Sequence, residues 1–138
     1  MLLTNKNAVI YGAGGAIGGA VARAFAREGA NVFLAGDTRR PIDTLTMEIA
    51  KTGGVAEAAQ VDALDGQAVE QHANSIIEKA GSIEVSFNLI SIPHVHGKPY
   101  VDLSLEEFAQ PLGAFATTHF LTATAAARHM ARANPVSS

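Results

Sequence analysis

Residues 9–18 read Val-Ile-Tyr-Gly-Ala-Gly-Gly-Ala-Ile-Gly, a short apolar run that passes through a glycine-rich turn into an alanine-rich segment. The run is short enough for a buried parallel strand, and glycine permits close backbone approaches that a Cβ atom would forbid. The following segment has helical spacing, so its first amides would face a bound phosphate. A tight turn without a ligand is the alternative. The context favours a dinucleotide phosphate site that uses Gly12, Gly14, Gly15, Ile17 and Gly18.

Composition restricts the chain to one domain and to a few classes of partner. Its 138 residues, 48% of them hydrophobic, can bury a single core, so residues 1–138 are expected to form one domain. Ten basic and thirteen acidic residues give a net charge of -3, which supplies no broad basic field for nucleic acid or an anionic membrane. The chain has no cysteine and begins without a charged, apolar leader. A cytoplasmic protein with a small-molecule partner is therefore expected.

Strands and helices are expected to alternate along the first ninety residues. Helical patterns that end at Gly29, Gly53 and Gly81 separate the apolar segments. Such alternation predicts right-handed crossovers and a parallel sheet covered on both faces. We therefore expect an α/β fold, a Rossmann-like doubly wound sheet in the order 3-2-1-4, with strands near residues 7–11, 31–35, 55–61 and 83–90.

The last third of the chain predicts helices and no further strand. Ser104 and Glu107 have the spacing of a capping box at a helix start. Pro111 is expected to end that short helix and to start a long one that runs to about Ala133. The residues after this helix are too few for another strand, so the sheet is expected to be truncated before a fifth strand.

The glycine-rich turn resembles that of the short-chain dehydrogenase/reductase family. Gly12 and Gly18 match the first and last glycines of the family's TGxxxGxG motif, while Tyr11 replaces its threonine and Ala16 its middle glycine. The resemblance implies a single NAD(P)-binding domain, incomplete relative to the family. It also implies an oxidoreductase that transfers hydride to or from a carbonyl or alcohol substrate, of which this chain is the N-terminal cofactor-binding portion.

Two further segments carry the same resemblance. Asp62 and Ala63 match the family's adenine-contacting Asp and its neighbour, and Asn88 matches the first asparagine of the NNAG motif. The resemblance implies that all three contact the cofactor. Taken alone, Asp62 is equally consistent with a helix cap, and Asn88 with a hydrogen-bonding group at the end of a strand.

The choice between NAD and NADP depends on Asp37, which lies 19 residues after Gly18. An acid at this spacing hydrogen-bonds the adenosine ribose of NAD and repels a 2'-phosphate. In the family, a basic residue at this position typically marks NADP users. NAD is therefore the expected cofactor, with NADP as runner-up because Arg39 or Arg40 could clamp a phosphate.

The family's catalytic residues have no counterpart in this chain. Phe115 stands where the resemblance places the asparagine of the Asn, Ser, Tyr, Lys set, and neither Tyr11 nor Tyr100 begins a YxxxK motif. The sequence therefore assigns no catalytic residue, and whether the chain is an enzyme is left open. A non-catalytic nucleotide-binding or interaction protein of the same fold is the alternative.

Histidines and small residues complete the sequence-based hypotheses. His94 and His96 form an HxH pair without a third ligand in view, so no metal site is expected. Residues 123–127 form a small-residue helix face that resembles the family's dimer surface, with core packing as the alternative for its inner side. A homo-oligomer is expected.

Overall fold

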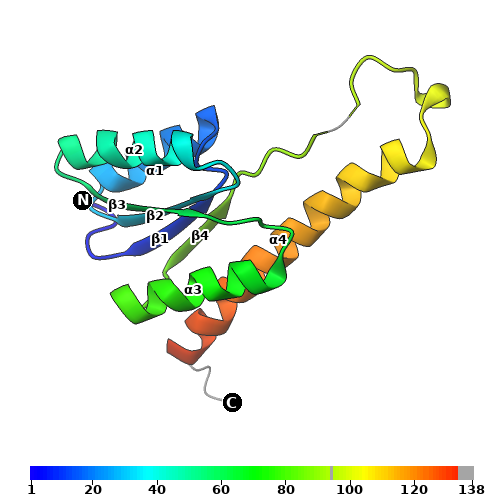
Figure 1. The fold of residues 1–138 in the computed structure, drawn as a ribbon. Coiled ribbons are helices and arrows are strands. Elements are labelled where there is room, and N and C mark those ends of the chain that lie inside the picture. The colour runs from blue at the N-terminus through cyan, green and yellow to red at the C-terminus, as the bar shows by residue number, and fades with distance from the viewer. Residues whose placement is uncertain (94, 134–138) are drawn as a thin grey trace.

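Four parallel strands form one sheet in the computed structural model, which describes residues 1–93 and 95–133 (Figure 1). Their order is β3-β2-β1-β4, as the sequence predicts. The central strand β1 pairs with β2 on one side and β4 on the other, so that Ile10 is in register with both Leu34 and Phe87. The strands are β1 (Asn7–Tyr11), β2 (Asn31–Gly36), β3 (Val55–Gln60) and β4 (Val85–Asn88).

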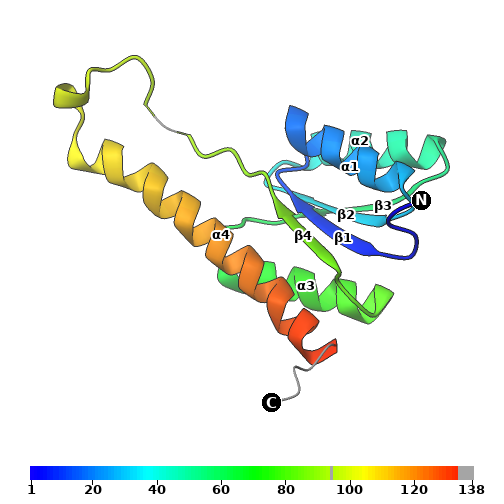
Figure 2. The same cartoon turned by 180° about the vertical axis from the view of Figure 1, so that it is seen from behind.

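Helices cover both faces of the sheet and make the fold three-layered. In Figures 1 and 2, α1 and α2 lie on one face, and α3 and α4 lie on the other. A short 3-10 helix, η1 (Tyr100–Asp102), precedes α4. The four helices are α1 (Ala16–Arg27), α2 (Arg39–Lys51), α3 (Gly66–Ala80) and α4 (Leu105–Ala133).

Alternation of side chains along β1 supplies two separate cores. Ile10 packs with Leu34 and Ile42 beneath α1 and α2, and all three are fully buried. Val9 points to the opposite face and packs with Val69 of α3. Burial of each large aliphatic side chain contributes about 1.5 to 3 kcal/mol, so the two cores fix the helices to the sheet.

The helix that begins after Ser104 corrects one prediction. The capping box is confirmed, because the Glu107 amide donates to the Ser104 hydroxyl at 3.0 Å and the Ser104 amide donates to Glu107 Oε1 at 3.1 Å. However, the expectation that Pro111 ends a short helix is wrong, since α4 runs unbroken through it. Proline removes one backbone donor and its fixed φ suits a helix, so the many remaining turn-to-turn hydrogen bonds of α4 carry it across.

The last strand is shorter than the predicted range 83–90. Its ladder with β1 ends where the Leu89 amide donates to the Tyr11 carbonyl oxygen at 2.9 Å. The next amide, that of Ile90, donates to the Asn88 side chain instead, at 2.9 Å. The chain therefore leaves the sheet at this point. Within the described residues, β4 pairs only with β1, and no described helix is long and apolar enough to cross a membrane.

Candidate functional site

A cavity of about 450 Å³ opens at the carboxyl ends of the strands. Ligands of open α/β sheets bind in this crevice, where successive crossovers leave the sheet in opposite directions. Here the reversal falls between β1 and β4. The loops after all four strands and one face of α4 line the cavity: Tyr11, Gly12, Gly14, Gly15, Ala35, Gly36, Asp37, Thr38, Pro41, Val61, Asp62, Ala63, Leu64, Leu89, Ile90, Ser91, Ile92, Pro93, Gln110, Ala114 and Thr118.

Two glycines of the β1–α1 turn are required by close backbone packing. Gly12 has φ +75°, and a Cβ atom there would lie 2.4 Å from the Leu89 carbonyl oxygen. A Cβ atom on Gly18 would lie 2.2 Å from the Gly12 carbonyl oxygen. Neither position tolerates a side chain without backbone movement. The absence of side chains at these two glycines therefore lets the start of α1 pack closely on the turn, at the rim of the cavity.

The first turn of α1 presents free backbone donors. Gly15 is the N-cap and supplies no side chain to cap the helix, and its carbonyl accepts from the Gly19 amide at 2.9 Å. The amides that precede Gly19 in the helix have no intrahelical partner, which makes this end a potential anion site. Ala16 is exposed, so the methyl group that replaces the family's middle glycine does not enter the packing.

The two predicted acids both lie on the cavity wall. Asp37 follows β2 and is exposed, and its backbone carbonyl accepts from Gln60 Nε2 at 2.9 Å. Asp62 follows β3, and its Oδ1 accepts from the Leu64 amide at 3.0 Å. The helix-cap alternative for Asp62 is wrong, because Asp65 caps α3 by accepting from the amides of its first turn.

Three of the predicted site residues do not line the cavity. Gly18 is buried in the packing of α1, and Ile17 is 68% exposed beside it. The Asn88 side chain accepts from Ile90 and donates to Thr122 Oγ1 at 3.3 Å, so it joins the end of β4 to α4. The cavity thus brings together six of the nine predicted residues: Gly12, Gly14, Gly15, Asp37, Asp62 and Ala63.

Sequence reasoning missed several residues of the cavity wall. Tyr11 lies at its floor and is 2% exposed, and burial raises the pKa of its hydroxyl to about 12. Gln110 and Thr118 lie on the face of α4 that borders the cavity. Only Tyr11 had a signal in the sequence, since it departs from the family motif. The α4 residues come from far along the chain, and the tertiary fold alone reveals them.

The position expected for a catalytic asparagine offers no acid, base or amide. Phe115 is 56% exposed on α4 and lies outside the set of cavity-lining residues. Its ring packs on that of His119, with 4.2 Å between the centroids, and its carbonyl oxygen lies 2.9 Å from His119 Nδ1. Within the part of the chain that the structure describes, no group of three His, Asp or Glu side chains could hold a metal ion; His94 lies outside that part.

The glycine turn, the parallel sheet and the cavity together define a dinucleotide-binding α/β domain. A family model described as Enoyl-(Acyl carrier protein) reductase matches residues 12–137. L-rhamnose 1-dehydrogenase (NAD(P)(+)) from Azotobacter vinelandii is 34% identical over 134 residues, which cover 94% of this chain and 52% of that protein. The chain belongs to the short-chain dehydrogenase/reductase family.

Solved structures agree with this assignment. NAD⁺-bound xylitol dehydrogenase is 26% identical and superposes with a TM-score of 0.89 over 97% of this chain and 51% of its own. A metagenomic short-chain oxidoreductase in complex with NADP is 25% identical, with a TM-score of 0.85 over 96% of this chain and 60% of its own. The chain spans about half the length of these proteins.

Proposed function

We propose that this chain binds NAD(H) and forms the cofactor-binding part of an oxidoreductase that moves hydride to or from a carbonyl or alcohol. The observation that carries the proposal is the cavity at the carboxyl ends of the strands, with the sterically required glycine turn on its rim. Its volume of about 450 Å³ lies within the usual range for cofactor sites.

Three parts of the cofactor, the pyrophosphate, the adenosine ribose and the adenine, have matching groups in the site. The free amides at the start of α1, near Gly14 and Gly15, fit the pyrophosphate. Asp37 fits the adenosine ribose, because a carboxylate accepts hydrogen bonds from both of its hydroxyl groups. Asp62 and Ala63 fit the adenine. Ile17 and Gly18 support the same turn, and we assign Asn88 to cofactor binding through the segment that it anchors.

The charges around the adenosine end favour NAD over NADP. Asp37 lines the cavity, whereas Arg39 does not. The Arg39 guanidinium is held by Asp43, with Nη2 to Oδ1 at 2.9 Å and Nε to Oδ2 at 3.3 Å. A 2'-phosphate would therefore meet the Asp37 carboxylate, and Arg39 is already paired with Asp43.

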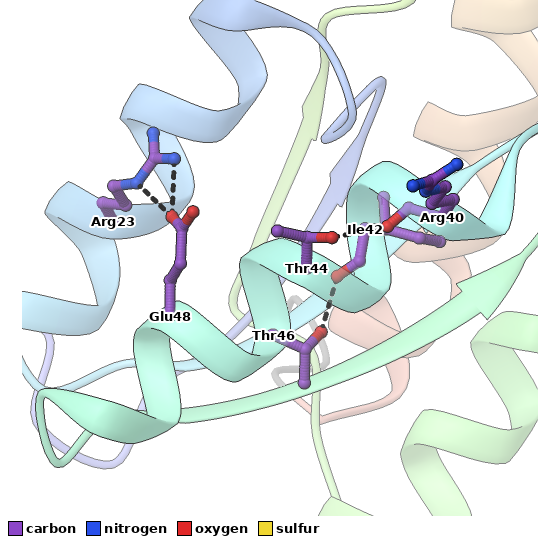
Figure 3. Close-up of polar contacts among 6 residues, drawn as sticks. All are labelled: Arg23, Arg40, Ile42, Thr44, Thr46 and Glu48. Carbon is purple, nitrogen blue, oxygen red and sulfur yellow. Dashed lines mark hydrogen bonds and ion pairs between the residues drawn. The ribbon is translucent and has the colours of Figure 1, made fainter.

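Arg40 is the residue that would favour NADP. It lines a neighbouring hollow together with Gly14 and Gly15, and within the described residues its guanidinium makes no ion pair. Figure 3 shows the contrast with Arg23, whose Nη2 is 2.7 Å from Glu48 Oε2 across α1 and α2. Arg40 therefore supports the runner-up cofactor, and the proposal predicts that Asp37 outweighs it.

Calorimetric titration of the chain with NADH and NADPH tests the proposal. NADH is expected to bind, and NADPH to bind more weakly. Asp37→Asn should bring the two affinities together, because it removes the charge that repels the 2'-phosphate. Glu70→Gln is the matched control, since Glu70 is an exposed carboxylate of α3 that lines neither the cavity nor the hollow of Arg40. NADPH binding ten times tighter than NADH would contradict the role of Asp37 and assign the phosphate to Arg39 or Arg40.

A non-catalytic nucleotide-binding or interaction protein is the second candidate, and Phe115 favours it. General acid-base catalysis contributes about 10²- to 10⁴-fold, and the family's YxxxK motif, which supplies the proton, does not occur in this sequence. We expect no oxidation of NADH by the 138-residue chain against a panel of carbonyl compounds. Oxidation of NADH by this chain would contradict the expectation that its residues do not catalyse hydride transfer by themselves.

Self-association belongs to the same proposal. The outer edge of β4 is unpaired within the described residues, and unpaired amides and carbonyls invite another strand. Of the small-residue face at 123–127, Ala125 and Ala126 are buried in the core, which confirms the core-packing alternative for its inner side. Ala123 and Ala127 remain exposed on the outer side. Light scattering should report a homo-oligomer.

A further inference from the structure

Tyr11 is the last residue of β1 and lines the cavity, and its hydroxyl makes no hydrogen bond within the described residues. The residue is 2% exposed, and the pKa of the hydroxyl is raised by burial. The hydroxyl is not among the enclosed polar atoms of the described residues that lack a partner, so it keeps access to the cavity, where a ligand atom can pair with it.

The residues around Tyr11 place it on the side of the cavity that we propose for the adenosine. In register with Tyr11 stand Ala35 on β2 and then Ala59 on β3, two small residues beside a large ring. Ala35 and Val61 line the cavity together with Tyr11 and pack in the same core cluster. The floor formed by these side chains thus extends from β1 toward the loop that carries Asp62.

The ring of Tyr11 is held in place by its packing. The ring of His72, on α3, meets it edge to face, with 6.3 Å between the centroids and 80° between the planes. Tyr11 also lies in the cluster formed with Val9 and Phe33. A side chain fixed in this way loses little conformational entropy when a ligand binds.

We propose that the Tyr11 hydroxyl donates a hydrogen bond to a ring nitrogen of the adenine base of bound NAD(H). The inference rests on the proposed nucleotide site and adds to it a residue at which this chain departs from its family. The ring nitrogens of adenine are acceptors. With its pKa near 12, the phenol keeps its proton at neutral pH and is available as a donor.

Tyr11→Phe tests the proposal because it removes only the hydroxyl. We expect Kd for NADH and for AMP to rise by the same factor, about threefold to tenfold, as for loss of one hydrogen bond. Tyr100→Phe is the matched control, since Tyr100 is 77% exposed and lies outside the cavity. It should change neither affinity. The thermal midpoint of Tyr11→Phe should not fall, because the hydroxyl has no protein partner to lose.

The outcomes separate this inference from the proposed function. If the unsubstituted chain binds neither NADH nor AMP, the nucleotide site itself is wrong, and the role of Tyr11 falls with it. If it binds both and Tyr11→Phe binds them equally well, the nucleotide site stands and the Tyr11 inference is overturned. Weaker binding of NADH with unchanged binding of AMP overturns the assignment to adenine. A lower thermal midpoint with unchanged affinities identifies the hydroxyl as structural.

Discussion

The β1–α1 turn and the N-terminal half of α4 both border the cavity, but their surroundings differ. In the turn, Gly12 and Gly18 are fixed by contacts with backbone atoms on either side. In α4, Leu105, Leu112 and Phe115 are exposed, and Figures 1 and 2 show this half of the helix extending beyond the sheet. The turn is therefore fixed by packing within this chain, whereas the N-terminal half of α4 is not.

The proposed cofactor contacts and the family's catalytic position fall in these two regions. The proposed contacts come from the turns after the four described strands. In α4, Phe115 stands where the family resemblance places a catalytic asparagine. Substitutions at Gly12 and Gly18 should therefore affect stability strongly, and substitutions at positions that are not buried in the N-terminal half of α4 should be tolerated or even favourable.

Gly18→Ala should have the largest effect. Its methyl group would lie 2.2 Å from the backbone oxygen of Gly12, and relief requires movement of α1. We expect a loss of about 3 kcal/mol or more in the free energy of unfolding, measured with urea. Gly15→Ala is the control in the same turn, because its methyl group would be 3.5 Å from the nearest atom. Equal effects of the two substitutions would contradict the packing that we describe.

Pro111→Ala should act in the opposite direction. It restores a backbone donor inside α4 and relieves the clash of the proline ring with the preceding turn. We expect a gain of about 1 to 3 kcal/mol in the free energy of unfolding. Pro41→Ala, in the first turn of α2, should give little change, since no intrahelical bond is missing there. A loss of stability in Pro111→Ala would show that the proline is required.

His72 should give the smallest effect, and one that depends on pH. Burial lowers its pKa, with Glu57 opposing and Lys79 adding to the shift, and its Nδ1 has no partner. A depressed pKa means that the unfolded chain takes up the proton first, so stability falls as pH drops below about 6.5. Thermal unfolding at pH 7 and pH 5 should show a smaller loss for His72→Phe than for the unsubstituted chain. Equal losses would contradict burial of His72.

Much of the fold could be predicted because local patterns agree with its topology. The apolar run before Gly12 and the glycines at the helix ends divide the chain into alternating strands and helices, and parallel order 3-2-1-4 follows. The predicted helix break at Pro111 is wrong because the local propensity of one residue is weaker than the cooperativity of a long helix. The predicted end of β4 is too late because the Ile90 amide, which would have continued the ladder, donates to the Asn88 side chain instead.

The site was predicted less completely than the fold. Asp37 was predicted from its spacing after Gly18 and Asp62 from the family resemblance. Both line the cavity because each follows a strand, and parallel strands bring their carboxyl ends to one edge of the sheet. Gln110 and Thr118 could not be found, since the path of α4 across the cavity depends on packing with α3 and β4. Sequence patterns thus identify groups carried by the turns, whereas groups on a crossing helix require the structure.

The most direct test of the account is an NMR titration of the isotopically labelled chain with NADH. The amides of residues 12–18, 36–38 and 62–64 should shift together and saturate with one affinity, because these segments line or support one cavity. The amides of the exposed first turns of α4, residues 105–109, should not move. Shifts confined to α4, or none at millimolar NADH, would contradict the claim that these turns form one nucleotide site.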